Sequence, residues 1–200
     1  MPAPIEFYFD FSSPYGYLAS TRIDALAGKH GRSVNWHPIL LGAVFRVTGS
    51  APLASIPLKG PYSERDMART ARLMGVPFSL PSRFPIPTQA AARVTLWVQG
   101  ADPQGAKALT GALYRAYFAE DLDISSAEVC ADVAARCGHE RAQALAGLND
   151  AHVKDRLRAE VDAAMARGVF GSPYFIVDDE PFWGADRLEQ VDRWLATGGW

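Results

Sequence analysis

Ile5–Ser20 reads IEFYFDFSSPYGYLAS, and the order of residue types in this stretch predicts a strand that passes directly into a helix. Residues 5–11 are mainly apolar and aromatic, which is typical of a buried strand. Proline has a fixed φ and no N–H, so Pro14 suits the first position of a helix, and Ser13 suits the N-cap before it. Backbone N–H groups and the helix dipole favour negative charge at that point. Ser13 is therefore either a simple cap or part of an anion site.

The composition is that of an ordinary globular protein. The chain has 200 residues, of which 48% are hydrophobic and 21% are charged, and its formal net charge is -2. We expect neither nucleic acid nor an anionic membrane as a partner, because both attract strongly basic surfaces. The N-terminus lacks the basic start and apolar core of a signal peptide, and no apolar run is long enough to span a membrane. The expected location is the cytoplasm.

Cysteine and histidine usage argues against a disulfide and against a metal site. The two cysteines, Cys130 and Cys137, are seven residues apart in a predicted helix, which is too far along its axis for a bridge. We expect both thiols to be reduced. The four histidines do not pair at the spacing of metal ligands: His30, His37, His139 and His152.

Two short α/β units are predicted at the ends of the chain. A helix over 15–29 leads to a second strand at 33–39, and this β-α-β order predicts that the two strands are parallel. Near the C-terminus, residues 174–183 predict two strands joined by a turn. A final helix is predicted over 184–196.

The middle of the chain has a different pattern. Residues 42–59 are rich in glycine, proline and small side chains, which predicts a loop with at most a short helical turn over 43–47. Helical patterns then continue up to the C-terminal unit. The predicted fold is therefore α/β: residues 1–40 and 168–200 form a thioredoxin-like domain, with a four-stranded mixed sheet and flanking helices. Residues 41–167 form an inserted all-helical domain.

Local signals predict where three of these inserted helices begin. Ser63 with Asp66 has the spacing of a capping box, and Gly75 is expected to end that helix. Ser125 predicts the start of the helix that carries both cysteines. Asn149 is the expected cap of the last helix before the C-terminal unit.

Three segments together resemble one known family. They are Phe9–Tyr15, Gly168–Phe175 and Phe182–Leu188, and they are similar to segments of the 2-hydroxychromene-2-carboxylate isomerases. These enzymes are relatives of the kappa-class glutathione transferases and, more distantly, of the DsbA-type disulfide oxidoreductases. The order and separation of the segments make the resemblance specific. A fourth group looks like part of the family's helical domain: Lys59, Tyr62, Asp66 and Arg69.

Two places depart from the family pattern. Pro87 and Thr88 occupy a region in which many of the isomerases have an asparagine. Ser172 stands where valine or alanine is more usual before the proline. The resemblance also implies that the peptide bond before Pro173 is cis, although most X-Pro bonds are trans.

The resemblance implies a glutathione site around Ser13. A DsbA-type oxidoreductase has Cys-x-x-Cys at this helix start, whereas residues 13–16 here read Ser-Pro-Tyr-Gly, so that disulfide cannot form. Ser13 is the implied catalytic residue, and its hydroxyl would donate to the sulfur of glutathione. The other implied contacts are Ser172 and Pro173 for the cysteinyl unit, Ala185, Asp186 and Arg187 for the γ-glutamyl end, and Lys59 for the glycyl carboxylate or an acidic substrate.

The implied activity is a glutathione-dependent isomerisation. It would interconvert 2-hydroxychromene-2-carboxylate and trans-o-hydroxybenzylidenepyruvate, or a related aromatic carboxylate, by reversible thiolate addition. The relatives also imply a homodimer. Four aromatic residues are candidates either for the core or for a substrate pocket: Trp36, Trp97, Tyr117 and Phe118.

Two alternative functions stay open on the sequence. One is a kappa-type transferase or peroxidase, which consumes glutathione. Another is a non-catalytic glutathione or peptide binder, because a fold does not fix a function. A protease-like nucleophile at Ser13 is disfavoured, because it would need an activating histidine and an orienting acid. No histidine is predicted near the start of that helix.

Overall fold

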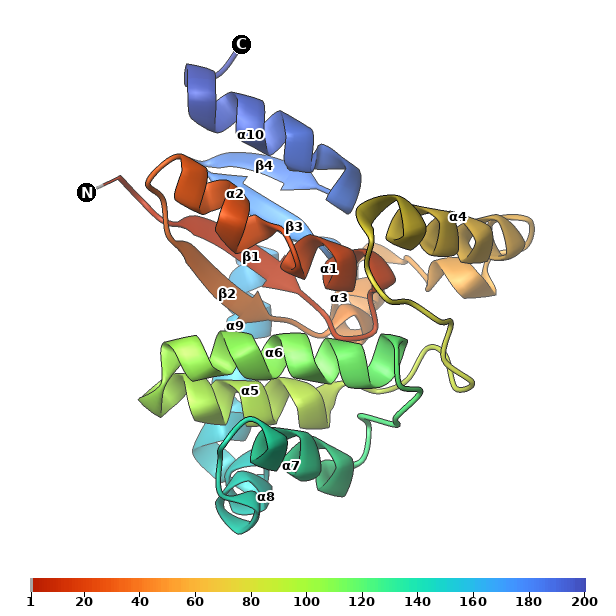
Figure 1. The fold of residues 1–200 in the computed structure, drawn as a ribbon, viewed down its shortest axis with the longest axis vertical. Coiled ribbons are helices and arrows are strands. Elements are labelled where there is room, and N and C mark those ends of the chain that lie inside the picture. The colour runs from red at the N-terminus through yellow and green to blue at the C-terminus, as the bar shows by residue number, and fades with distance from the viewer. Residues whose placement is uncertain (1) are drawn as a thin grey trace.

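The computed structural model describes residues 2–200 and contains a four-stranded mixed sheet (Figure 1). The strand order is β2-β1-β3-β4, with β1 parallel to β2 and antiparallel to β3. β3 and β4 form an antiparallel hairpin. The predicted thioredoxin-like sheet is therefore confirmed. The strands are β1 (Ile5–Phe9), β2 (Val34–Pro38), β3 (Tyr174–Val177) and β4 (Glu180–Trp183).

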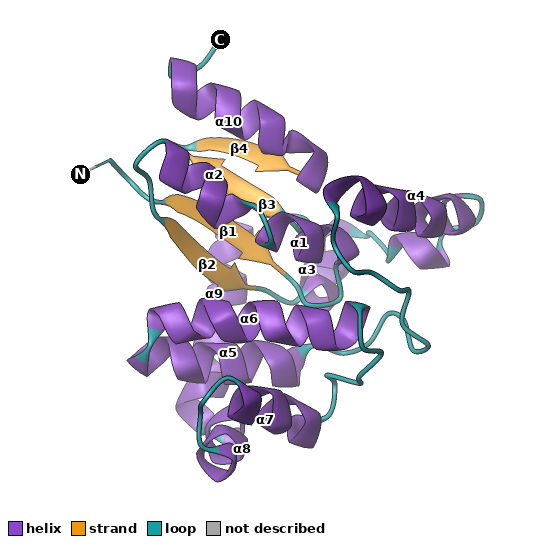
Figure 2. Ribbon diagram, viewed as in Figure 1, coloured by secondary structure: helices purple, strands orange, loops and turns teal. Residues whose placement is uncertain are grey.

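Every regular element between β2 and β3 is helical, as Figure 2 shows. On β2, the Trp36 indole donates to Asp24 on α2, whereas the neighbouring His37 contacts Glu160 on α9. Successive strand residues point to opposite faces, so α2 and α9 cover opposite faces of the sheet. The helices are α1 (Pro14–Ser20), α2 (Ile23–Lys29), α3 (Leu41–Thr48), α4 (Lys59–Met74), α5 (Gln89–Ala101), α6 (Pro103–Phe118), α7 (Ala127–Arg136), α8 (Arg141–Asn149), α9 (Ala151–Ala166) and α10 (Leu188–Thr197), with short 3-10 turns η1 (Leu53–Ser55) and η2 (Ala185–Arg187).

One hydrophobic core runs through the sheet and the helices. Phe9 on β1 packs edge-on against Phe11, Phe11 packs against Tyr114 on α6, and Tyr114 stacks on Phe118. All four rings are completely buried. Because this aromatic chain crosses from the sheet into the helical part, the predicted boundaries of the two domains do not coincide with a gap in packing, and they stay a prediction.

The first part of the helical insertion differs from the sequence prediction. The sequence predicts a loop over 42–59 with at most a short helical turn over 43–47, but a longer helix, α3, occupies Leu41–Thr48, and η1 follows it. α4 begins at Lys59 instead of at Ser63, and the Ser63 hydroxyl is buried and donates to the Gly60 carbonyl at 2.8 Å. The helix pattern thus extends one turn further back than the capping signal suggested. Gly75 ends α4 in the left-handed conformation, as predicted.

Two other helix caps lie one residue after the predicted positions. Ser126, not Ser125, caps α7 and accepts from the Val129 N–H. Asp150, not Asn149, caps α9. Adjacent polar residues compete for the same cap, and the backbone conformation of the preceding loop decides between them.

The two cysteines are free, and they lie on and just after α7. Cys130 is completely buried, and burial raises the pKa of its thiol to about 12. Cys137 is half-buried just after the last turn. Within residues 2–200, no helix is both long and apolar enough to cross a membrane.

His37 joins the sheet to α9. Its Nε2 lies 2.5 Å from a Glu6 carboxylate oxygen on β1, its Nδ1 lies 3.0 Å from Glu160 on α9, and its ring stacks on Tyr8. Burial lowers the pKa of His37, but hydrogen bonds and charge from Glu160 and Glu6 outweigh burial, so the pKa is raised. His37 lowers the pKa of Glu160 in turn. The imidazolium form therefore holds two strands and a helix together.

We expect His37→Gln to lower the free energy of unfolding by about 1–3 kcal/mol, the size expected for lost hydrogen bonds to charged groups. A raised histidine pKa stabilises the fold fully below the unfolded-state pKa of about 6.5, and the contribution is lost as pH rises through the folded-state pKa. The difference from wild type should therefore be largest at about pH 5–6.5 and shrink at higher pH.

Urea unfolding across this pH range measures the effect, with His152→Gln as the control because His152 is exposed on α9. If the stability difference between wild type and His37→Gln grows as pH rises, a charged His37 does not stabilise this cluster.

Candidate active site

Ser13 caps the helix that follows β1. Its backbone is extended, with φ -92° and ψ 111°, and its Oγ accepts from the Gly16 N–H at 3.0 Å. Pro14 occupies the first turn of α1, as predicted. Ser13 is only 6% exposed, so its hydroxyl lies just beneath the surface at the positive end of the helix.

The loop before β3 meets this helix start. The Ser13 hydroxyl donates to the Ser172 carbonyl at 2.8 Å, across a sequence separation of 159 residues. The Ser172–Pro173 bond is cis, as the resemblance implies. Within residues 2–200, the Ser172 N–H has no acceptor. Ser172 is half-buried, and it therefore presents an N–H group beside the Ser13 hydroxyl.

Asp10 is the buried polar residue that organises the site, and sequence reasoning did not single it out. Its carboxylate accepts hydrogen bonds from the Ser12 N–H at 2.7 Å and the Leu41 N–H at 2.6 Å. The Ser12 and Thr88 hydroxyls complete the set at 2.8 Å and 3.0 Å. One carboxylate thus joins the end of β1 to the starts of α3 and α5. The feature of the sequence that could have identified Asp10 is a single acidic residue among aromatic residues at the end of a predicted strand.

The backbone of Asp10 fixes the two halves of the site. Its N–H donates to Ser172 Oγ at 2.9 Å, and its carbonyl accepts from the Ser13 N–H at 2.9 Å. The buried Tyr114 hydroxyl donates to the same carbonyl at 2.9 Å. The serine at 172, which departs from the family pattern, therefore holds the loop against β1.

Burial raises the pKa of Asp10, because the carboxylate is completely enclosed, while the hydrogen bonds from Ser12, Leu41 and Thr88 act in the opposite direction. Two of the donors are backbone N–H groups, which cannot become acceptors. An ionised carboxylate satisfies all four donors at once. Thr88 also departs from the family pattern, and here its hydroxyl contributes one of these bonds.

Gly16 allows α1 to approach this network. A Cβ at Gly16 would lie 2.6 Å from the Tyr114 hydroxyl oxygen and 2.9 Å from Ser172 Oγ. Both distances are shorter than a normal contact, so a larger residue would displace α1 or the loop. Gly16 is the position at which an oxidoreductase has its second cysteine, and in this chain the space is filled by Tyr114 and Ser172.

The predicted γ-glutamyl site lies beside the same loop. The Gly184 N–H donates to the Pro173 carbonyl at 3.0 Å, and η2 packs against α1. Ala185–Arg187 form this 3-10 turn, and α10 begins after it at Leu188, so the predicted final helix starts later than expected. Asp186 is exposed and pairs with Arg187 at 3.5 Å. Its carboxylate is not used as a helix cap.

Lys59 lies on α4, and it is another residue of this helix, Asp66, that contacts α1. α4 contacts α1 because the Tyr15 hydroxyl donates to Asp66 at 2.5 Å, and Arg69 pairs with Asp66 and with the Tyr62 hydroxyl. Lys59 is exposed at the first residue of α4, two turns before Asp66. This tyrosine–carboxylate–guanidinium contact was not predicted, because nothing in the sequence shows that α4 returns to α1.

Three of the four aromatic candidates lie in the core, and the fourth packs against it. Trp36, Tyr117 and Phe118 are buried, and Trp97 is half-buried against Gly147. Trp36 lines a cavity of about 560 Å³ together with Tyr17, and the other three candidates are not among the residues that line it. Within residues 2–200, no histidine side chain bonds to Ser13, and no group of three His, Cys, Asp or Glu side chains could hold a metal.

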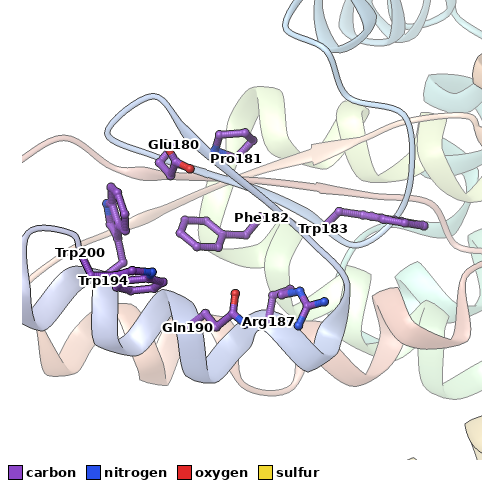
Figure 3. A pocket seen from close by; sticks show the side chains of 8 residues that line it. All are labelled: Glu180, Pro181, Phe182, Trp183, Arg187, Gln190, Trp194 and Trp200. Atoms are coloured by element: carbon purple, nitrogen blue, oxygen red, sulfur yellow. The ribbon is translucent and has the colours of Figure 1, made fainter.

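A cavity of about 400 Å³ lies between β4 and α10 (Figure 3). Arg187 and Gln190 line one side of it, and Trp194 lies further along the helix. Phe182 points toward α10, whereas Trp183 extends away and packs against Phe170. The cavity therefore touches the predicted glutathione contacts only at Arg187.

Residues 4–196 match the family described as the DSBA-like thioredoxin domain. This match covers nearly the whole chain. The chain belongs to the DSBA-like thioredoxin domain family. Within this family, the absence of cysteine at residues 13–16 distinguishes the chain from an oxidoreductase with a Cys-x-x-Cys site.

Several curated relatives of this DSBA-like protein are named as enzymes. A 2-hydroxychromene-2-carboxylate isomerase of Pseudomonas putida is 29% identical over 190 residues, which cover 94% of this chain and 92% of the relative. Glutathione S-transferase kappa 1 of Rattus norvegicus is 28% identical and covers 97% of this chain and 94% of its own length. A solved 2-hydroxychromene-2-carboxylate isomerase superposes with a TM-score of 0.86 at 28% identity, covering 96% and 94% of the two chains. These likenesses confirm the family resemblance.

We expect Gly16→Ala to lower the free energy of unfolding by about 1–3 kcal/mol, because the new methyl group overpacks the space between Tyr114 and Ser172. Chemical denaturation measures this change. Gly111→Ala on α6 is the matched control, since its Cβ would meet nothing within 4 Å. That variant should be neutral or stabilised by up to about 1 kcal/mol, because alanine favours a helix. Equal stability of the two variants would contradict the close approach at Gly16.

Proposed function

We propose that this protein is a glutathione-dependent isomerase that interconverts 2-hydroxychromene-2-carboxylate and trans-o-hydroxybenzylidenepyruvate or a closely related aromatic carboxylate. The observation that carries the proposal is the Ser13 hydroxyl. It stands at a helix N-terminus, at the place of a redox cysteine, beside an open peptide edge at Ser172. A hydroxyl and a helix end can stabilise a thiolate that the protein itself does not supply. The likeness to named isomerases supports the reaction type.

The chemical groups around Ser13 fit glutathione. The free Ser172 N–H suits an extended cysteinyl unit, which would pair as a strand does at a sheet edge. The Asp186 carboxylate suits the γ-glutamyl ammonium, while the N–H groups of η2 and the Arg187 guanidinium suit its carboxylate. Lys59 is exposed and would bind the glycyl carboxylate or an acidic substrate. The donors and acceptors thus match the charges of the tripeptide.

When bound, glutathione would supply a thiolate that adds reversibly to the conjugated ring carbon of the substrate and is later expelled unchanged. Ser13 would lower the thiol pKa by donating a hydrogen bond to the thiolate, with help from the N–H groups of α1. Ser172 orients the cysteinyl unit, and Asp10 holds both serines in place through its backbone. Lys59 would hold either the glycyl carboxylate of glutathione or the carboxylate of the substrate. Two further expectations, the homodimer and the cytoplasmic location, stay predictions.

We expect Ser13→Ala to lower isomerase turnover by about 10²-fold, the size seen when a single donor to a reacting anion is removed. Glutathione should still bind, because its other contacts remain. Absorbance assays with the chromene carboxylate measure turnover, and calorimetric titration measures binding. Ser20→Ala is the control, since Ser20 lies on the same helix and bonds only locally to Tyr17.

Full activity of Ser13→Ala, or undiminished activity of the wild type without glutathione, would refute the proposal. Loss of the Ser13 cap also costs about 1 kcal/mol of stability, so unfolding is measured in parallel.

A kappa-type transferase or peroxidase is the second candidate, favoured by the likeness to glutathione S-transferase kappa 1 of the rat. An isomerase returns glutathione unchanged, whereas a transferase or peroxidase consumes it. Parallel assays with a chromene carboxylate, an electrophilic aryl halide and a hydroperoxide, each followed by titration of the remaining thiol, distinguish these activities. Binding of glutathione without turnover of any substrate would identify a non-catalytic binder.

A further inference from the structure

The proton of the Ser13 hydroxyl is already engaged in the structure. A serine hydroxyl has one proton, and here it is donated to the Ser172 carbonyl at 2.8 Å. The oxygen also accepts from the Gly16 N–H at 3.0 Å. A thiolate near the start of α1 therefore receives no hydrogen bond from Ser13 until the Ser13–Ser172 bond is broken.

Breaking the Ser13–Ser172 hydrogen bond without a replacement costs free energy, because it leaves the Ser172 carbonyl without a donor. The Ser13 hydroxyl is the donor that the Ser172 carbonyl has in this structure, and a half-buried carbonyl without a donor is unfavourable. The loop is also held from two sides. Asp10 donates to Ser172 Oγ, and Gly184 donates to the Pro173 carbonyl. The loop is thus restrained in the position that faces Ser13.

A peptide thiol carries the replacement donor on the same residue as its sulfur. In glutathione, the cysteinyl amide N–H lies beside the thiol-bearing carbon. If the cysteinyl unit pairs with Ser172 as an added strand, this N–H would donate to the Ser172 carbonyl, and its carbonyl would accept the free Ser172 N–H. Because the Ser172 carbonyl would then keep a donor when Ser13 leaves it, the Ser13 proton would be available to the sulfur without that cost.

We propose that the Ser13–Ser172 hydrogen bond makes thiol activation conditional on a ligand amide. A thiol with an acylated cysteine nitrogen gives the Ser172 carbonyl a replacement donor, so the Ser13 hydroxyl can turn to the sulfur and stabilise it as a thiolate. A thiol without that N–H leaves Ser13 bound to Ser172. This inference rests on the proposed function. It explains why the protein would activate γ-glutamyl-cysteine thiols in preference to simple thiols: only the former bring a replacement donor for the Ser172 carbonyl.

The test compares glutathione with a depsipeptide analogue in which an ester oxygen replaces the cysteinyl amide N–H. Both are bound at saturating concentration to the whole protein, and the thiol pKa of each is measured by the ultraviolet absorbance of the thiolate. S-methylglutathione provides the baseline. In wild type, the acid dissociation constant of the thiol should be roughly tenfold larger for bound glutathione than for the bound analogue. The glutathione thiol then has the lower pKa, which is the effect of one hydrogen bond to the charged form.

The same comparison in Ser13→Ala shows whether the ligand amide changes the thiol pKa through the Ser13 hydroxyl. If the amide acts through Ser13, the two ligands should have equal thiol pKa values in this variant. Ser13→Gly repeats the measurement in case the alanine variant folds poorly, since glycine is tolerated at a helix cap.

Equal pKa values in wild type, or a difference that persists without the Ser13 hydroxyl, would overturn the inference while leaving glutathione binding intact. Failure of wild type to bind glutathione would overturn the proposed function and this inference together.

Discussion

The Asp10 hydrogen-bond network is the constraint on which the rest of the site depends. A completely buried carboxylate is costly unless donors surround it, and here the surrounding donors come from three different segments of the chain. The same residue uses its backbone to hold Ser13 and Ser172. Removing Asp10 would therefore disturb the folding of three segments and the geometry of the site at once. Stability and site geometry are not separable at this residue.

The site retains the electrostatics of a thioredoxin-type redox centre without its thiols. The helix N-terminus still favours an anion, and the loop before β3 still faces it. Ser13 stands where the first thiol would be, and Gly16 leaves the place of the second thiol to Tyr114 and Ser172. The two remaining cysteines lie on and just after α7, and burial raises the pKa of Cys130 so that its thiol is unreactive. The architecture therefore suits a thiol brought by a ligand.

The contacts that attach the helices to the sheet and to each other also help to position the segments around Ser13. α9 is joined to β1 and β2 through His37 and its two carboxylates, and the chain passes from the end of α9 directly into the loop that carries Ser172. Tyr15 joins α1 to α4 in the same way through Asp66. Polar contacts of α9 with the sheet and of α4 with α1 thus position the two flanks of Ser13, while the aromatic core fills the space between them.

The sequence alone determined the features that depend on neighbouring residues. These are the strand-to-helix turn at Ser13–Pro14, the α/β units at both ends, and the absence of Cys-x-x-Cys, because propensity, capping and residue identity are local properties. Cap positions at Ser126 and Asp150 were missed by one residue, since adjacent side chains compete for one cap. Only the tertiary structure decided that Ser13 bonds to Ser172 and that Asp10 collects its donors. Those contacts join residues far apart in the chain, and packing of the whole core brings them within hydrogen-bond distance.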